Sequence, residues 1–330
     1  MDVHTSGTAA VLATRDLLDQ ALEQWVAALG ADHVILDTPR RQAAETATFT
    51  TTHRIPAIIR PANREEVQEC LRVANRFRIP VYPVSSGKNW GYGSRVPSRD
   101  ASVLLDLSRM NRIQEFDEKL AYVTVEPGVT QRQLFQFLGA RNSGLWMDAT
   151  GSSPDCSLIG NVVERGFGHT PYGDHFAQVC AFEVVLPTGD LAETGFSRFG
   201  SAPSGRVYRW GVGPSLEGLF SQSNLGIVTR MTIWLMPAPE HFEAFFFQCN
   251  RHDQLAPLVE ALRPLRLQGV LRSTVHIAND YKVLGGIQQY PWQETNGETP
   301  LRPEVMEQLR FVSDWGGRFL VRAPALELYA

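Results

Sequence analysis

The sequence predicts a mixed α+β fold, because strand-like apolar segments and amphipathic helices follow one another without an internal repeat. Residues 55–84 predict a strand, a helix and a second strand, with a crossover long enough to make the two strands parallel. Residues 182–194 predict a β-hairpin around the turn at residues 187–190. The chain has 330 residues, which is enough for about two domains.

Residues 1–54 are expected to form an N-terminal helical segment of the first domain. Residues 15–29 predict a helix that ends at Gly30, with five apolar residues on one face: Leu18, Leu22, Trp25, Val26 and Leu29. An apolar stretch at residues 34–36 follows, and a polar stretch then leads to His53.

The helix over residues 64–78 has the clearest pattern. Its apolar residues recur at helical spacing: Val67, Cys70, Leu71, Ala74 and Phe77. Asn63 is the expected N-cap, and Glu66 stands three residues later in the capping-box position. Thr130 is the expected N-cap of another helix, over residues 130–138.

Strands are expected at residues 55–59, 79–84, 103–107, 121–125 and 225–237. The composition changes near the prolines at 237 and 239, so we place a domain boundary at residue 238. The first domain would then cover residues 55–237, and a second, partial domain would cover residues 238–330. In the second part we expect an aromatic stretch, a helix, a strand and a polar loop, at residues 242–247, 255–265, 270–277 and 288–303.

The composition is that of a globular protein, with 43% hydrophobic and 20% charged residues. The net charge of −4 and the lack of a basic patch argue against binding to nucleic acid or to a membrane surface. No apolar run approaches the roughly 18 residues that suggest a membrane span. Residues 1–14 hold no basic cluster followed by an apolar stretch, so we expect no secretory signal and a cytoplasmic location.

The four cysteines, Cys70, Cys156, Cys180 and Cys249, lie far apart and form no C-x-x-C pair. We expect them to be reduced and mostly buried. No group of cysteines and histidines has the spacing of metal ligands, so we expect no metal site.

A glycine-rich loop follows the strand at residues 79–84. Its residues are Pro83, Val84, Ser85, Ser86, Gly87, Lys88, Asn89, Trp90, Gly91, Tyr92, Gly93 and Ser94. Such a loop exposes backbone N–H groups and lets the chain approach a phosphate or diphosphate closely. A plain connecting loop would use the same turn residues. Likewise, Tyr92 is either a packing aromatic or a phenol that lines a pocket.

A second glycine-rich segment covers residues 151–175 and contains five glycines. Its hydroxyls, backbone donors and carboxylate suit a cofactor with a polar ring edge, although a long buried connection is the other reading. His169 and His175 lack an evident third ligand for a metal. Asp174 would act either as a base or as the cap of a turn.

Five stretches, taken in order, resemble the vanillyl-alcohol oxidase / p-cresol methylhydroxylase family of flavoproteins. They are residues 83–94, 125–129, 160–166, 170–175 and 220–229 with 234–237, within a resemblance that covers roughly residues 55–265. It implies an FAD-binding domain of the p-cresol methylhydroxylase (PCMH) type, made of two α+β subdomains, followed by the start of an α+β substrate or cap domain.

The resemblance also implies which residues bind FAD. The loop at residues 83–93 would bind the diphosphate, and residues 151–175 would run beside the isoalloxazine ring. The residues implied outside the first loop are Glu126, Pro154, Ser157, Gly160, Asn161, Arg165, Gly166, Thr170, Tyr172, Gly173, Gly226, Ile227 and Val228.

In this family, para-substituted phenols lose a hydride from the benzylic carbon to FAD, which gives a quinone methide that water attacks. By this resemblance Tyr92 helps to bind the phenolate, and Asp174 is the carboxylate near flavin N5. The electron acceptor would be oxygen or a partner cytochrome c, and the protein could be a homo-oligomer. A covalent link to the flavin, present in some members, involves a residue later in the chain.

In the family the cap domain continues further and the chain then returns to the FAD domain. The sequence here ends at Ala330, so we expect a truncation, for example by a frameshift near residues 316–317. Two alternatives therefore stand beside the phenol-oxidising enzyme. One is an inactive FAD-binding remnant that pairs with an intact homologue, and the other is a flavoenzyme of the same fold that acts on hydroxy acids.

Overall fold

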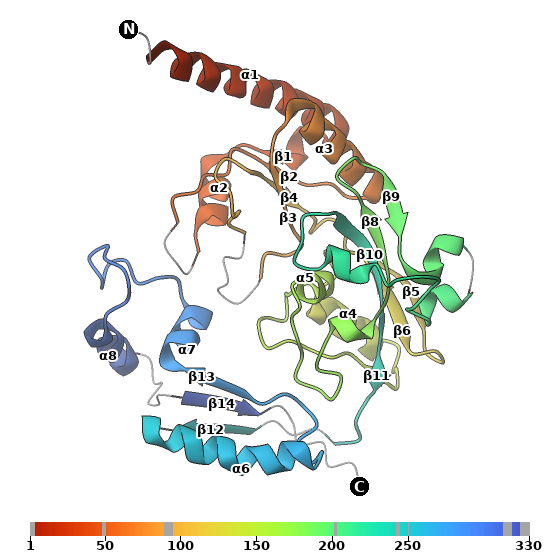
Figure 1. The fold of residues 1–330 in the computed structure, drawn as a ribbon, viewed down its shortest axis with the longest axis vertical. Helices are drawn as coiled ribbons and strands as arrows, with labels where there is room; N and C mark the ends of the chain where they lie inside the picture. Colours follow the sequence, from red (N-terminus) through yellow and green to blue (C-terminus); the bar gives the residue numbers. More distant parts are fainter. Residues whose placement is uncertain are drawn as a thin grey trace.

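The computed structural model describes residues 4–47, 51–88, 95–200, 203–241, 245–249, 251–312 and 319–323. Two sheets with their helices form the first part of the chain, and a third sheet lies in the part after residue 241 (Figure 1). The α+β prediction is therefore confirmed. The boundary at residue 238 stays a prediction.

The first sheet has four strands in the order β1-β2-β4-β3. These strands are β1 (Val34–Ile35), β2 (Ile58–Ile59), β3 (Val81–Val84) and β4 (Val103–Asp106). Both β2 and β3 run parallel to β4, which lies between them. The predicted strand–helix–strand unit is thus present, but its two strands are not neighbours. The strand expected over residues 55–59 is confined to its last two residues.

The two faces of this sheet are covered by different helices. Ile59, Val103 and Leu105 belong to the core that also contains residues of α1 (His4–Leu29) and α3 (Arg64–Phe77). Ile58 and Leu104 point the other way, into a smaller core that includes Ala44 of α2 (Thr38–Glu45). This alternation follows from the two-residue period of a strand.

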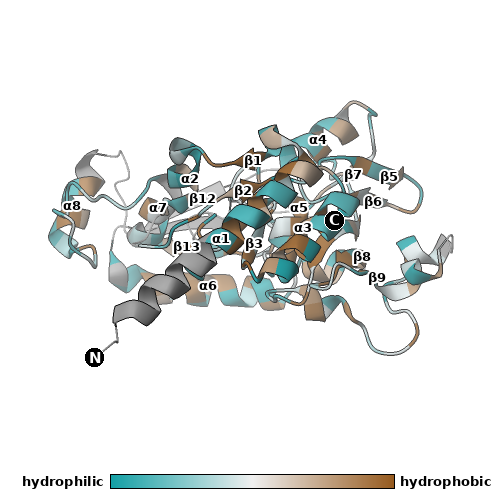
Figure 2. Ribbon diagram, turned by 90° about the horizontal axis from the view of Figure 1, so that it is seen from above, coloured by the Kyte–Doolittle hydropathy of each residue, from teal (hydrophilic) through white to brown (hydrophobic). Residues whose placement is uncertain are grey.

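Helix α1 packs along α3, and Figure 2 shows α3 with both polar teal and apolar brown residues. Trp25 is fully buried, and its indole N–H donates to the Cys70 carbonyl oxygen at 3.2 Å. Val26, which we expected on the same apolar face, is instead 37% exposed. The helix also begins eleven residues earlier than expected, at His4 rather than residue 15.

Helix α3 begins as its sequence predicts. The Asn63 side chain accepts the Glu66 backbone N–H at 2.8 Å, and Glu66 returns to accept the Ala62 N–H at 2.7 Å. Arg78 ends the helix in the left-handed conformation, with φ of 55°.

The second sheet has five antiparallel strands in the order β5-β6-β10-β8-β9. They are β5 (Ile113–Asp117), β6 (Tyr122–Val125), β8 (Val179–Val185), β9 (Leu191–Glu193) and β10 (Ile227–Trp234). The predicted hairpin is confirmed as β8 and β9. A second core joins this sheet to α4 (Gln131–Gly139) and α5 (Leu158–Val163). Thr130 caps α4 as expected, by accepting the Gln133 N–H.

Shorter elements complete this part. The strands β7 (Leu145–Trp146) and β11 (Met236–Pro237) form a small antiparallel pair. Single 3-10 turns lie at Ala31–His33, Phe176–Gln178, Gly195–Phe199, Pro203–Arg206, Glu217–Phe220 and His252–Gln254.

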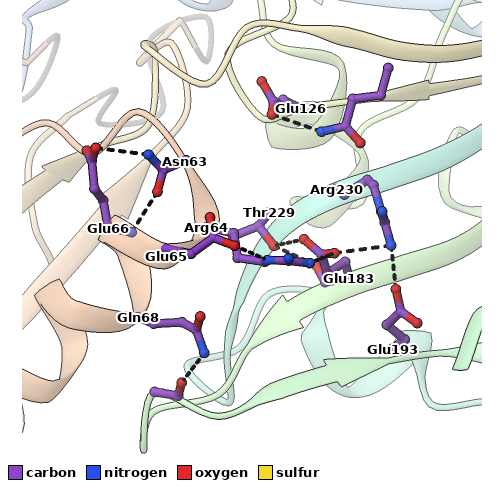
Figure 3. A network of polar contacts seen from close by, with 12 residues as sticks. Asn63, Arg64, Glu65, Glu66, Gln68, Glu126, Glu183, Glu193, Thr229 and Arg230 are labelled. Carbon is purple, nitrogen blue, oxygen red and sulfur yellow. Dashed lines mark hydrogen bonds and ion pairs between the residues drawn. The ribbon is translucent and has the colours of Figure 1, made fainter.

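A buried carboxylate joins the two sheets of the first part (Figure 3). Glu183 of β8 is 5% exposed and lies 2.9 Å from Arg64 of α3 and 3.1 Å from Arg230 of β10. It also accepts the Thr229 hydroxyl at 2.9 Å. A buried carboxylate is stable only with such partners, so this network fixes the start of α3 on the second sheet.

The third sheet is antiparallel, in the order β12-β14-β13. Its strands are β12 (Phe245–Cys249), β13 (His276–Asn279) and β14 (Phe319–Ala323). The helices of this part are α6 (Leu255–Leu267), α7 (Asp280–Ile287) and α8 (Pro303–Val312). The strand expected over residues 270–277 is therefore misplaced, since residues 268–275 form a loop before β13. The polar loop expected over residues 288–303 is present up to the start of α8.

Three cysteines, Cys70, Cys156 and Cys180, are free and buried, as expected. In the described ranges, His, Cys, Asp and Glu side chains nowhere gather in threes as a metal site would require. None of the described helices combines the length and apolarity that a membrane crossing needs.

Candidate functional site

The loop after β3 reaches the first turn of α5. The Ser157 backbone N–H donates to the Ser86 hydroxyl oxygen at 3.1 Å. A Cβ on Gly160 would lie 3.2 Å from the Ser85 hydroxyl, so the glycine allows this close approach. Gly87 turns the loop with φ of 66°, and Lys88 after it is exposed. The two glycine-rich segments of the sequence are thus brought together.

Ser157 is the N-cap of α5 and holds that helix in place. Its hydroxyl accepts the Gly160 N–H at 2.9 Å and donates to the Pro127 carbonyl oxygen at 2.6 Å. The carbonyl of Pro154 is also used, since it accepts the Arg132 N–H at 2.8 Å.

A buried polar chain runs behind the second glycine-rich segment. His175 Nδ1 lies 2.5 Å from Asn161 Oδ1, and because an amide oxygen only accepts, Nδ1 is the donor. On the other side of the ring, Nε2 lies 3.2 Å from Asp148 Oδ2. The side chains of Asp148 and His175 are both 6% exposed. Asp148 Oδ1 in turn accepts the Thr170 backbone N–H at 3.2 Å.

Two glycines leave room for this chain. A Cβ on Gly166 would lie 2.3 Å from Asn161 Nδ2. A Cβ on Gly168 would lie 1.9 Å from Asp148 Oδ1 and 2.4 Å from His175 Nε2. Both distances are far below ordinary contact, so glycine is needed at each position for steric reasons.

The segment 170–174 is a tight turn that presents Asp174 at its end. The Thr170 hydroxyl oxygen accepts the Tyr172 N–H, and Gly173 adopts φ of 57°. The Asp174 carboxylate is exposed, and its Oδ1 accepts the Ala177 N–H at 3.1 Å. It therefore caps a turn, while a ligand can still reach it. The phenol of Tyr172 donates to the Leu235 carbonyl oxygen at 3.2 Å, and burial raises its pKa, so it remains a donor at neutral pH.

Asp174 and Tyr172 line a cavity of about 620 Å³, a volume within the usual range for small-molecule sites. The other lining residues are Arg165, Phe167, Pro171, Gly173, Arg266, Arg272 and Thr274. The cavity therefore lies between the second glycine-rich segment and the loop before β13. Ring contacts of His276 with Phe167, at 4.9 Å, and with His169, at 4.4 Å, join the same two segments.

The remaining predicted site residues fall into two groups. Asn89, Trp90, Gly91, Tyr92 and Gly93 lie outside the described residues, so their assignment stays a prediction. The others are described, and each has a structural role of its own: Pro83 and Val84 in β3, together with Glu126, Gly226, Ile227 and Val228.

Glu126 is fully buried, and both of its carboxylate oxygens are occupied. They accept the Arg112 backbone N–H, the Arg112 guanidinium and the Gln114 amide, at 2.7–3.0 Å. Glu126 thus holds the turn after β6. A Cβ on Gly226 would lie 2.4 Å from Val184 Cγ1, so this glycine allows β10 to pack on β8. Ile227 and Val228 are buried in the first and second cores.

Asp148, Arg266 and Arg272 were missed from the sequence. Asp148 stands in a short stretch without a motif, and it meets His175 only through the fold. The two arginines lie in and after a helix of the third part, where nothing in the local pattern separates them from solvated surface residues.

Several known proteins are similar to this chain in sequence or in structure. A family model described as an FAD binding domain matches residues 55–195. A 4-cresol dehydrogenase [hydroxylating] flavoprotein subunit of Pseudomonas putida is 33% identical over 90% of this chain and 58% of its own length. A crystal structure of p-cresol methylhydroxylase with substrate bound superposes with a TM-score of 0.78 at 31% identity, over 93% of this chain and 60% of that one. The chain contains an FAD binding domain and is similar to flavoproteins of the vanillyl-alcohol oxidase / p-cresol methylhydroxylase family.

Two further members are similar to the chain. The 1'-carboxy-chondrochloren decarboxylase of Chondromyces crocatus is 51% identical over 91% of this chain and 55% of its own length. A 4-ethylphenol oxidase from Gulosibacter chungangensis, in an isoeugenol complex, has a TM-score of 0.78 at 32% identity, over 94% of this chain and 60% of that one. The chain thus spans somewhat more than half the length of the relatives that it matches.

FAD is the cofactor of this family, and the described residues fit it. The loop at residues 85–88 combines two hydroxyls, a left-handed glycine and an exposed lysine beside the first turn of α5. This donor set suits a diphosphate. The turn at residues 170–174 offers a buried hydroxyl and an exposed carboxylate for the polar edge of the ring.

Proposed function

We propose that the protein is an FAD-dependent oxidoreductase that oxidises para-substituted phenols at the benzylic carbon. The observation that carries this is the exposed carboxylate of Asp174, which shares its cavity with the phenol of Tyr172 beside the glycine-rich FAD segment. The 4-cresol dehydrogenase subunit and the 4-ethylphenol oxidase, each about one third identical, support the same chemistry.

Asp174 is the base of this proposal. FAD, when bound, supplies the two-electron oxidant that accepts a hydride from the benzylic carbon of the phenolate. The substrate becomes a quinone methide, water adds to its benzylic carbon, and Asp174 takes the proton that this water loses. Tyr92 is proposed to bind the phenolate oxygen.

The buried chain Asn161–His175–Asp148 positions this base. His175 is the next residue after Asp174; its Nδ1 donates to Asn161 Oδ1, and its Nε2 lies 3.2 Å from Asp148 Oδ2. Asp148 also accepts the Thr170 N–H, so both ends of the 170–174 turn are fixed to one buried pair. A carboxylate held in this way loses little freedom on meeting substrate.

A second candidate reaction is decarboxylation of a carboxylated substrate. It is favoured by the 51% identity to a protein named 1'-carboxy-chondrochloren decarboxylase. The two candidates differ in their products, since the first leaves every carbon atom in the organic product and the second releases CO2.

Anaerobic mixing of the FAD-loaded chain with a panel of substrates tests the proposal. The panel is a 4-alkylphenol, 4-hydroxybenzyl alcohol and a simple hydroxy acid, with flavin absorbance as the readout. We expect bleaching with both phenols. Bleaching by the hydroxy acid alone would refute phenol oxidation, and CO2 release from a carboxylated phenol would favour the second candidate. An oxygen or cytochrome c acceptor is then distinguished by which of the two restores the absorbance.

A further inference from the structure

The cavity beside Asp174 has an unusual charge. Three arginines line it, Arg165, Arg266 and Arg272, while Asp174 is the one acidic residue among the lining residues that the structure describes. The lining of the cavity is therefore positively charged, whereas the whole chain carries a net charge of −4. Neighbouring guanidinium groups repel one another, and a bound anion relieves that repulsion.

Arg165 is held in a conformation that arginine rarely adopts. It follows α5 with φ of 55°, in the left-handed region that is unfavourable for a residue other than glycine. Its Nε donates to the Ser221 hydroxyl at 2.7 Å, and its guanidinium carbon lies 3.9 Å from the centre of the Phe176 ring. These contacts fix the side chain at the cavity although glycine would suit the backbone better.

Arg266 fixes the loop that carries Arg272. Its Nη1 donates to the carbonyl oxygens of Leu271 at 2.8 Å and of Arg272 at 2.5 Å. Arg272 itself is exposed and lines the cavity. The loop therefore places a positive side chain in the cavity that Arg165 and Asp174 also line.

Apart from Thr274, the rest of the lining is apolar or aromatic. Phe167, Pro171 and Tyr172 provide it, and Phe167 is 45% exposed, so a ring that binds here meets ring and aliphatic surface. A cavity with aromatic walls and a cluster of arginines matches an aromatic carboxylate, because guanidinium groups bind carboxylates by paired hydrogen bonds.

We propose that Arg165 and Arg272 bind a carboxylate on the substrate, so that the natural substrate is an anionic phenolic acid. Arg266 is a positioning residue that holds the Arg272 loop. This inference rests on the proposed function, because it assigns a second polar group to the phenol that Asp174 serves.

The test compares two ligands that differ in charge alone, 4-hydroxyphenylacetate and 4-hydroxyphenylacetamide. Their binding to the FAD-loaded chain is measured by calorimetry at neutral pH, where the acid is ionised. We expect the acid to bind at least about tenfold more tightly than the amide, as charge-assisted hydrogen bonds do. Arg272→Gln should lower the ratio of acid affinity to amide affinity by about tenfold. In the parent protein, rising salt should lower the same ratio.

Two variants make the test specific. Arg165→Gly removes the side chain and relieves the left-handed backbone, so it should lower the preference for the acid without lowering the melting temperature. Arg263→Gln is the matched control, because Arg263 lies on the same helix as Arg266 but lines a neighbouring cavity and pairs with Glu260. It should leave the preference unchanged.

Equal affinities for acid and amide, or an equal loss in Arg263→Gln and Arg272→Gln, would overturn the inference. So would an acid that displaces FAD, since the arginines would then belong to the cofactor site. The phenol oxidation is scored separately, by anaerobic bleaching of the flavin with a neutral 4-alkylphenol. If the neutral 4-alkylphenol does not bleach the flavin but the acid still binds in an arginine-dependent way, the proposed function is refuted. The carboxylate site is then still supported.

Discussion

Replacing Gly168 by alanine should damage the fold of the site directly. The new Cβ would lie 1.9 Å from Asp148 Oδ1, 2.2 Å from Asp148 Cγ and 2.4 Å from His175 Nε2. Ordinary contact between such atoms is about 3.5 Å, so one side chain must move by about 1 Å or more. Both side chains are 6% exposed, so either movement disturbs a packed interior.

The cost follows from what that movement breaks. Overpacking a core costs about 1–3 kcal/mol, and loss of a buried hydrogen bond costs about 1–3 kcal/mol more. Displacing Asp148 removes its contacts with His175 and with the Thr170 N–H. We therefore expect Gly168→Ala to lower the free energy of unfolding by about 3 kcal/mol and to slow formation of the hydroxylated product from a phenol, because the Asp174 turn is no longer held.

A thermal melt and a measurement of the rate at which the hydroxylated product forms from a phenol check this prediction. Gly139→Ala is the control, since Gly139 is the last residue of α4 and has nothing within 4 Å of an added Cβ. It should be neutral or stabilising by up to about 1 kcal/mol. In a double-mutant cycle, Gly168→Ala should cost less in an Asp148→Ala background, where the nearest clash is gone. Additive costs, or a Gly168→Ala variant that melts and reacts like the parent, would refute the reasoning.

Three other outcomes are expected. Asp174→Asn keeps the shape and loses the base, so formation of the hydroxylated product from a phenol should slow by roughly 100-fold while FAD still binds. An unchanged rate of product formation with a lower melting temperature would leave Asp174 a turn cap. Glu183→Gln should lower the free energy of unfolding in urea by about 2 kcal/mol, because it leaves Arg64 and Arg230 without their shared buried carboxylate. Glu65→Gln is the control at an exposed ion pair and should change this free energy by less than about 0.5 kcal/mol. Equal effects of the two substitutions would contradict the reasoning. Burial raises the pKa of the Cys70 and Cys180 thiols from 9.0 to about 12, so the protonated thiols stabilise the fold below about pH 9 and this contribution is lost as the pH rises toward 12. In a Cys70→Ala/Cys180→Ala variant, the free energy of unfolding in urea should therefore fall less steeply between pH 9 and pH 12 than in the parent protein. An equally steep fall in the two proteins would contradict this.

Local signals in the sequence predicted the elements that local contacts determine. The cap of α3 depends on Asn63 and Glu66 alone, and both hydrogen bonds are present. The hairpin of β8 and β9 depends on its turn residues and is likewise present. Helix α2 was missed because its residues are mostly polar, although Asp37 caps it by accepting the Arg40 N–H.

Distant contacts determine what the sequence did not show. Strand β4 separates β2 from β3, a pairing that no local pattern encodes. Strand β13 begins only at His276, where β14 supplies its partner from more than forty residues later. The site likewise combines local and distant features. Its glycine-rich segments were predicted from their local composition. The meeting of Asp148 with His175, and of Arg165 with Arg272, depends on the tertiary fold.

The benzylic hydride transfer is tested most directly by an isotope effect on flavin reduction. The FAD-loaded chain is mixed anaerobically with a 4-alkylphenol and, separately, with the same phenol deuterated at the benzylic carbon. We expect both phenols to bleach the flavin, and the deuterated phenol to reduce it several-fold more slowly, because the benzylic C–H bond breaks as the hydride leaves. Bleaching at equal rates, or bleaching by hydroxy acids and not by phenols, would contradict it.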